Sequence, residues 1–406
     1  MMKKKRILSG LLCAALLLSC AACQSEAPRE QKSESSSASS ESAKSSEASK
    51  SSEMSKSSES SSASAVSLVQ PYSDIRYIEG FANYNKEIYE ADEFRPEDIR
   101  AFTFNRGTVL KGSEELAEQI MEAGKNPGLG VRSLHERGIT GKGINVAIID
   151  QNMVLDHPEF AENIAKYYDT GCEMPADRGS MHGPAVTSLL VGKSIGVAPE
   201  AKVYYAAFPS WLKDSQYAAD GVSWIIEENK KLPEGEKIRV VSVSAAPSGK
   251  GSPFEKNLEA WDKAAAALKE EGILLLDCRS GEETGFIYPA YFDPENPEDV
   301  SKCKGGFPTH PSSQLPDDKI GVPNAYRTTA EEYYASTPSY QYNGSAGLSW
   351  SIPYAAGVLA LGWQVDPTLT NDEIVQLLFD TCGTGADGSK IINPVAFVEE
   401  IEKRKK

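Results

Sequence analysis

From about residue 127 onward, short apolar runs alternate with longer helix-like stretches, and this alternation restricts the fold more than any other feature. The apolar runs have the length of buried strands, and they lie at 144–149, 202–207, 238–243 and 273–276. The helix-like stretches between them lie at 183–192, 218–231 and 253–271. Such alternation predicts an α/β fold with a mostly parallel sheet flanked by helices on both faces. Near the C-terminus, Thr370 and Glu373 before an apolar run have the spacing of a capping box and predict the start of a further helix.

The charge balance excludes one class of partner. The 406 residues include 42 Lys and Arg against 58 Asp and Glu, a formal net charge of −16. An acidic body of this size repels polyanions, so we expect no nucleic-acid partner.

The first 23 residues are typical of a bacterial lipoprotein signal peptide. A basic cluster, Lys3–Arg6, precedes the apolar run Ile7–Ser19, which at about 13 residues is too short to span a bilayer. The run ends at Leu-Leu-Ser-Cys20 and again at Cys-Ala-Ala-Cys23, and both resemble a lipobox, in which the Cys is acylated. We prefer Cys20, with Cys23 as the alternative; an ordinary cleaved signal peptide is the competing interpretation. The expected location is the extracellular face of a bacterial membrane, with attachment through an N-terminal lipid.

Residues 24–65 form a predicted disordered linker. From Gln31 to Ala65 there are 19 Ser in 35 residues and no aromatic residue, so this tract cannot bury enough surface to offset the entropy of ordering. Residues 66–126 carry aromatic residues among many charges and form an N-terminal extension or pro-like segment. Whether this segment is cleaved stays open.

Three short motifs carry candidate catalytic groups. Asp150 directly follows a predicted strand, His182 opens an apolar helix, and Ser349 precedes a long apolar helix with Pro353 in its first turn. Taken singly each has an ordinary explanation, since Asp residues cap loops and a lone His is more often structural. Together they supply a serine nucleophile, an imidazole base and a carboxylate that orients the imidazole.

The order and context of these motifs resemble the subtilisin-like serine proteases, the subtilases. The matching segments are Val-Ala-Ile-Ile-Asp150, His182-Gly-Pro-Ala-Val and Gly347-Leu-Ser-Trp-Ser-Ile-Pro-Tyr-Ala-Ala-Gly357. The resemblance extends from about Pro127 to Phe397 and implies a three-layer subtilisin-like domain at 127–406 with Asp150, His182 and Ser349 as a catalytic triad. It also implies a peptide or protein substrate, no cofactor, and a chain that we expect to be a monomer.

The family also implies a place for the substrate. Ser244, Ala245 and Ala246 follow a predicted strand at the position where subtilases pair with substrate as an added strand. The family usually has Gly where Ala246 stands, so the entrance to the pocket is expected to be narrower.

Other features depart from the family. Subtilases place an oxyanion-binding Asn after the strand at 273–276, but the sequence there reads Asp277-Cys-Arg-Ser-Gly281. Arg279, Ser280 and the more distant Asn324 are open candidates for that donor, whose loss costs about 10²–10³ in rate in a known protease. The short segment 190–197 removes space for a family calcium loop, so we expect no metal. Residues 282–337 are expected to form a loop region near the active-site face, where a disulfide between Cys278 and Cys303 is a further prediction.

Two functions follow from the sequence. The first is a secreted, membrane-anchored serine endopeptidase. The second is a catalytically weakened subtilase-fold lipoprotein that serves as a binding or scaffolding module. An α/β-hydrolase esterase fits poorly, because that family runs Ser, Asp, His in chain order and Trp350-Ser351 breaks its Gly-x-Ser-x-Gly motif.

Overall fold

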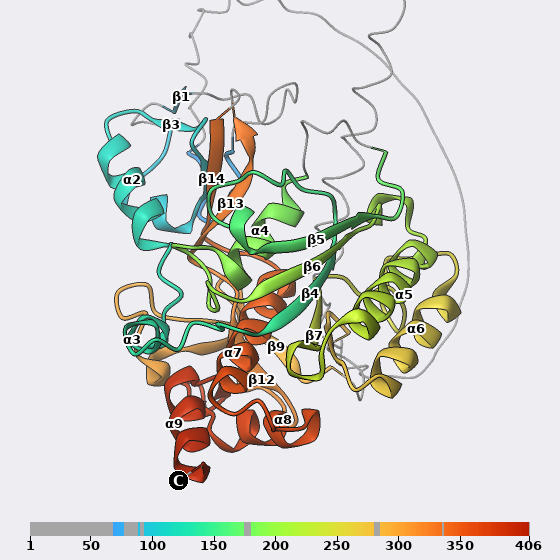
Figure 1. Ribbon diagram of the computed structural model, residues 1–406. Coiled ribbons are helices and arrows are strands. Elements are labelled where there is room, and N and C mark those ends of the chain that lie inside the picture. The colour runs from blue at the N-terminus through green and yellow to red at the C-terminus, as the bar shows by residue number, and fades with distance from the viewer. Residues whose placement is uncertain are drawn as a thin grey trace, which may run out of the picture.

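The computed structural model describes residues 68–76, 88–89, 93–173, 180–279, 285–334 and 337–405. The predicted signal peptide 1–23, its two candidate lipidated cysteines and the linker 24–65 lie outside the described residues, as does Ser280. Figure 1 shows the arrangement of the elements.

A parallel five-stranded sheet lies at the centre of the protein. Its strand order is β5-β6-β4-β7-β8, and every neighbouring pair is parallel. The strands are β4 (Asn145–Asp150), β5 (Ile164–Asp169), β6 (Lys202–Ala207), β7 (Ile238–Val243) and β8 (Leu274–Asp277). Four of the five are the strands predicted from the apolar runs, to within one residue at each end. The α/β prediction with a parallel sheet is therefore confirmed.

Helices pack on both faces of this sheet (Figure 1). They are α4 (His182–Val191) and α7 (Ser351–Val365) on one face, and α5 (Ser215–Lys231) and α6 (Leu258–Glu270) on the other. Successive strand side chains point to opposite faces, so Val146 and Ile148 enter the core beneath α4 and α7, whereas Ala147 and Ile149 enter the core beneath α5 and α6. This two-sided burial explains why the strands are almost continuously apolar.

The helix boundaries follow local chain signals. α6 begins five residues later than the predicted Pro253, because Asn257 directly before it has a left-handed backbone with φ 52°. α8 (Asn371–Asp380) begins at the predicted capping box: Thr370 Oγ1 accepts from Glu373 N, and Glu373 Oε2 accepts from Thr370 N. Two further helices of residues 127–406 are α3 (Val131–Glu136) and α9 (Pro394–Arg404).

Much of the expected loop region at 282–337 is instead strand, which corrects that expectation. A six-stranded sheet has the order β11-β10-β9-β12-β16-β15. Its strands are β9 (Ile287–Tyr291), β10 (Lys304–Phe307), β11 (His310–Pro311), β12 (Ile320–Pro323), β15 (Gly383–Thr384) and β16 (Lys390–Ile391). The strands here are short and several contain Gly or Pro, so the sequence lacks the long apolar runs that marked the central sheet.

The N-terminal extension contributes a strand to a third sheet. The order is β13-β14-β2, all antiparallel, with β2 (Thr103–Asn105), β13 (Arg327–Tyr334) and β14 (Thr337–Asn343). The other elements of the extension are β1 (Ile88–Tyr89), η2 (Pro96–Ala101), β3 (Val109–Leu110) and α2 (Glu114–Ala123). Phe102 and Phe104 are buried in a core that also contains Tyr342 of β14. The extension therefore packs directly on the strand that leads to Ser349.

The predicted disulfide between Cys278 and Cys303 is wrong. No disulfide bond joins any two of the described cysteines, which are Cys172, Cys278, Cys303 and Cys382. Cys303 is fully buried in the main core and its sulfur lies 3.9 Å from the carbonyl of Asp299 in its own turn, whereas the amide of Cys278 donates to Ala245 at the end of the central sheet. The two residues are thus fixed by different local contacts.

Two features are absent from the part of the chain that the structure describes. No helix there is both long and apolar enough to cross a membrane. Within the same ranges, no cluster of three or more His, Cys, Asp or Glu side chains has the arrangement of a metal site.

Candidate active site

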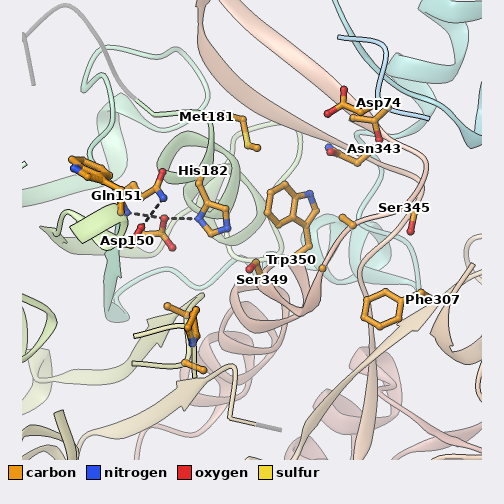
Figure 2. A pocket seen from close by; sticks show the side chains of 18 of the residues that line it. Asp74, Asp150, Gln151, Met181, His182, Phe307, Asn343, Ser345, Ser349 and Trp350 are labelled. Atoms are coloured by element: carbon orange, nitrogen blue, oxygen red, sulfur yellow. Dashed lines mark hydrogen bonds and ion pairs between the residues drawn. The ribbon is translucent and has the colours of Figure 1, made fainter. Parts of the chain in front are cut away.

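Asp150, His182 and Ser349 all line one cleft of about 950 Å³. Each arrives there from a different element: Asp150 ends β4, His182 opens α4, and Ser349 lies in the helical turn η7 (Leu348–Trp350) before α7. The carboxyl ends of parallel strands meet at one edge of a sheet, which brings together residues 32 and 167 positions apart. Figure 2 shows the imidazole of His182 between Asp150 and the indole of Trp350.

The Asp150–His182 pair has the geometry expected of an oriented base. His182 Nδ1 lies 2.6 Å from Asp150 Oδ1, and the two residues are only 8% and 2% exposed. The amide of Gln151 donates to the same carboxylate oxygen at 2.8 Å. Ser180 Oγ accepts from the amides of His182 and Gly183, which fixes the start of α4 and hence the position of the ring.

A buried tyrosine, Tyr205, holds the loop that follows Asp150. The hydroxyl of Tyr205 donates to the carbonyl of Gln151. Burial raises the pKa of Tyr205 well above its ordinary value, so the hydroxyl stays a neutral donor. This bond holds the main chain directly after Asp150.

Ser349 is bonded to a different partner from the one expected. Its hydroxyl donates to the carbonyl of Ser244 at 3.1 Å, and the hydroxyl of Ser244 donates to the carbonyl of Ser349 at 2.8 Å. A catalytic triad would join Ser349 to His182 by a hydrogen bond, but no such bond is formed between these two described residues. The reciprocal bonds instead tie the serine loop to the end of β7.

Trp350 contributes to the site although sequence reasoning gave it no role. Its ring meets the His182 ring edge-on, with centroids 5.3 Å apart and planes at 67°. The indole is only 5% exposed and lines the same cleft. The only sequence signal for this contribution was that Trp350 directly follows Ser349. The serine motif itself does not require an aromatic residue at that position.

The predicted substrate segment also reaches the cleft. Ala245 and Ala246 line it, and Ser244 lies beneath it through the bonds to Ser349. The carbonyl of Ala246 accepts from Ser252 Oγ at 2.6 Å, and the carbonyl of Ala245 accepts from the amide of Cys278. The segment is therefore held on both sides before any substrate arrives.

The two described oxyanion candidates lie away from the cleft lining. The guanidinium of Arg279 bonds to Asp277 at 2.6 Å, and Asn324 Nδ2 donates to the carbonyl of Ala346 at 2.6 Å. Neither side chain lines the cleft that contains Ser349. Asn324 instead positions a residue of the loop that leads to the serine.

Residues from the N-terminal extension and from the six-stranded sheet complete the cleft. Tyr72, Asp74, Arg76 and Thr103 line it from the extension, and Phe307 lines it from β10. In Figure 2, Asp74 and Phe307 lie on the opposite side of Trp350 from His182. The aromatic and charged composition of residues 66–126 was the only sequence signal for this contribution.

Comparisons with known proteins agree with the fold and the motifs. Residues 141–284 match the model of the subtilase family, a span that contains Asp150 and His182 and ends before Ser349. Subtilisin NAT of Bacillus subtilis subsp. natto is 24% identical over 260 residues, which is 61% of this chain and 63% of that protein. The subtilisin-like protease PopC of Myxococcus xanthus is 26% identical over 280 residues, which is 61% of this chain and 57% of that protein. The matches thus span about three fifths of the length of these relatives.

A solved structure shares the fold. Fervidolysin from Fervidobacterium pennivorans, a keratinolytic enzyme related to subtilisin, aligns with a TM-score of 0.50 and 16% identity, covering 69% of this chain and 45% of that one. The family match over residues 141–284 and the sequence relatives thus make this chain similar to the subtilisin-like serine proteases, and the parallel sheet that ends at Asp150 agrees with that similarity.

Proposed function

We propose that this protein is a secreted, membrane-anchored serine endopeptidase that hydrolyses peptide bonds with Asp150, His182 and Ser349. The observation that carries the proposal is the buried 2.6 Å pair between Asp150 and His182 in the cleft that Ser349 also lines. An imidazole that donates through Nδ1 to a carboxylate keeps its Nε2 as an acceptor. That nitrogen can take the proton of a serine hydroxyl.

The reaction begins with a rotation of the Ser349 side chain away from Ser244. Once its hydroxyl turns to His182, Nε2 accepts the proton while Oγ attacks the substrate carbonyl carbon. His182 then returns the proton to the leaving amine, and a water molecule repeats the sequence to release the acyl group. Asp150 stabilises the imidazolium that forms at each step.

The same rotation would free an acceptor for the substrate. Ser244 O accepts from the Ser349 hydroxyl at 3.1 Å. After rotation this carbonyl can accept a hydrogen bond from a substrate amide, which suits the proposed role of Ser244, Ala245 and Ala246 as the strand-pairing segment. Substrate binding and activation of the nucleophile would thus be coupled.

Main-chain amides at the start of η7 and α7 are the proposed donors to the oxyanion. Ser349 lies where the positive end of the α7 dipole adds to these N–H groups. Since Arg279 and Asn324 are engaged elsewhere, we expect a slower enzyme than one with a full set of donors, by about 10²–10³ per missing donor.

The decisive experiment measures cleavage of an unfolded protein by the wild type and by Ser349→Ala, His182→Ala and the double variant. Because the triad acts as a unit, each single variant should lose at least about a thousandfold in turnover, and the double variant should be little worse. Ser223→Ala serves as the control, because it removes an exposed serine hydroxyl on α5 that does not line the cleft. Turnover of Ser349→Ala equal to that of the wild type would reject the mechanism.

A second function has its own support. The Ser349 hydroxyl is bonded to Ser244 rather than to His182, and neither Arg279 nor Asn324 lines the cleft. Both facts favour a protein with weakened catalytic activity that serves as a peptide-binding or scaffolding module. A serine-directed fluorophosphonate separates the two functions: labelling of the wild type at Ser349 supports the endopeptidase, and peptide binding without labelling supports the scaffold.

Membrane anchoring rests on the sequence at Cys20 and Cys23. Metabolic labelling with a fatty-acid analogue should tag the wild type and leave the double variant Cys20→Ala, Cys23→Ala untagged. Single variants then identify the acylated cysteine. Equal labelling of the wild type and the double variant would overturn the lipid anchor without affecting the catalytic proposal.

A further inference from the structure

The N-terminal extension forms one wall of the cleft. The Tyr72–Arg76 segment is fixed to β2 by a parallel bridge between Asp74 and Thr103, with Ile75 N donating to Thr103 O and Thr103 N donating to Ser73 O. β2 in turn pairs with β14, whose last residue, Asn343, also lines the cleft. The wall is thus built on the strand that continues to Ser349.

Asp74 is held rigidly within this wall. Its Oδ2 accepts from Arg76 Nη2 at 2.7 Å, and its Oδ1 accepts from Arg76 Nε at 2.9 Å, which is the two-point geometry of a guanidinium–carboxylate pair. Arg76 Nη1 donates to Gln341 Oε1 at 2.7 Å inside the protein. The guanidinium of Arg76 therefore fixes the position of the Asp74 carboxylate from the interior of the protein.

The two charges of this pair are not equally available to a ligand. The side chain of Arg76 is 5% exposed, whereas that of Asp74 is 33% exposed. The other charged residues of the cleft wall, Lys213 and Glu255, pair with each other at 2.7 Å on the surface. At the extension, then, the cleft presents a carboxylate whose positive partner is buried.

We propose that Asp74 is a specificity-determining residue that receives a basic side chain of the substrate, on the side C-terminal to the scissile bond. This inference rests on the proposed function. We take the strand-pairing segment Ser244–Ala246 to bind the residues before the scissile bond, and it reaches Ser349 from β7. Asp74 reaches the cleft from the β14 side and lies beyond Trp350 in Figure 2. A carboxylate held in place before binding loses little conformational entropy when it meets Lys or Arg.

Peptide binding tests the proposal without requiring turnover. Fluorescent peptides that carry either one Lys or one Gln in an otherwise uncharged sequence are titrated against the Ser349→Ala protein and against Ser349→Ala with Asp74→Asn. The first protein should bind Lys peptides about five- to tenfold more tightly than their Gln partners. Asp74→Asn should remove that preference. Glu97→Gln, an exposed carboxylate-to-amide change in the same extension, should retain it.

Further variants keep the outcome decisive. Asp74→Glu should retain a Lys preference, and Asp74→Ser replaces Asp74→Asn if the latter lowers the melting temperature. Where the wild type cleaves peptides, the cut sites should show the Lys preference after the scissile bond. No Lys preference in binding, or one that survives both Asp74→Asn and Asp74→Ser, would overturn the inference, and a preference confined to residues before the cut would contradict its placement. Failure of the wild type to cleave any peptide bears on the proposed function instead.

Discussion

Glu331 is a buried carboxyl group on β13 at the junction with the N-terminal extension. Its Oε1 accepts from Asn105 Nδ2 of β2 at 3.0 Å, and its Oε2 accepts from Ser339 Oγ at 3.2 Å. Burial raises the pKa of Glu331 to about 7, against a smaller lowering by Arg76. Between the ordinary carboxyl pKa and about 7, the folded protein therefore binds a proton that the unfolded chain has released.

This linkage predicts how stability depends on pH. Since the folded state binds more protons over this range, the free energy of unfolding should fall as pH rises from about 4.5 to about 7, by on the order of 3 kcal/mol. Glu331→Gln keeps the shape and cannot ionise, so it should flatten this dependence and exceed the wild type in stability at pH 8. Urea unfolding of the wild type and of Glu331→Gln at pH 5 and pH 8 measures the pH dependence and the difference in stability at pH 8. Glu118→Gln, exposed on α2, should leave the wild-type slope unchanged; a wild-type slope in Glu331→Gln would assign the dependence to another group.

At the scale of elements, Gly344 joins β14 to the loop that leads to Ser349. Its amide donates to Phe102 O, and a Cβ added there would lie 2.1 Å from the carbonyl oxygen of Ala101. Gly344→Ala must therefore push the extension away from β14, and we expect a loss of about 1–3 kcal/mol in stability. Hydrogen exchange at the Gly344 and Thr103 amides should become faster.

Gly235→Ala is the control for this change, because a Cβ there meets nothing within 4 Å. It should leave both the melting temperature and these exchange rates near the wild-type values. An unchanged melting temperature in Gly344→Ala would mean that the extension can shift at little energetic cost.

Elements with strong periodicity were predictable from the sequence, and elements assembled from distant short segments were not. Four strands of the central sheet and the capped start of α8 follow local patterns of apolar residues and capping groups. β2 has three residues, and its partner β14 lies more than 200 positions later, so no local pattern could reveal the pairing. For the same reason the motifs of Asp150 and His182 predicted that these two residues lie together, whereas nothing in the sequence placed Asp74 and Phe307 in the same cleft.

At the scale of the whole molecule, the extension and the remainder of the chain share buried structure. The rings of Phe104 and Tyr342 pack at a tilt of 36° with centroids 5.2 Å apart, and Tyr342 Oη donates to the carbonyl of Arg100. The amide of Thr328 on β13 donates to Gly124 O. Without the extension, β14 would lose β2, one of its two neighbouring strands, and Tyr342 would face water.

These shared contacts predict the effect of truncation. A chain that begins at residue 127 should yield little soluble protein or melt well below a chain that begins at residue 68, because the exposed apolar surface and unpaired strand edge exceed what a margin of about 5–15 kcal/mol tolerates. Soluble yield and thermal unfolding of the two chains provide the comparison. Supplying residues 68–126 as a separate polypeptide should restore part of the stability by reforming the β2–β14 pair. Equal melting temperatures for the two chains, with no response to the added segment, would show that residues 127–406 fold without the extension and that the cleft wall containing Asp74 is an accessory to them.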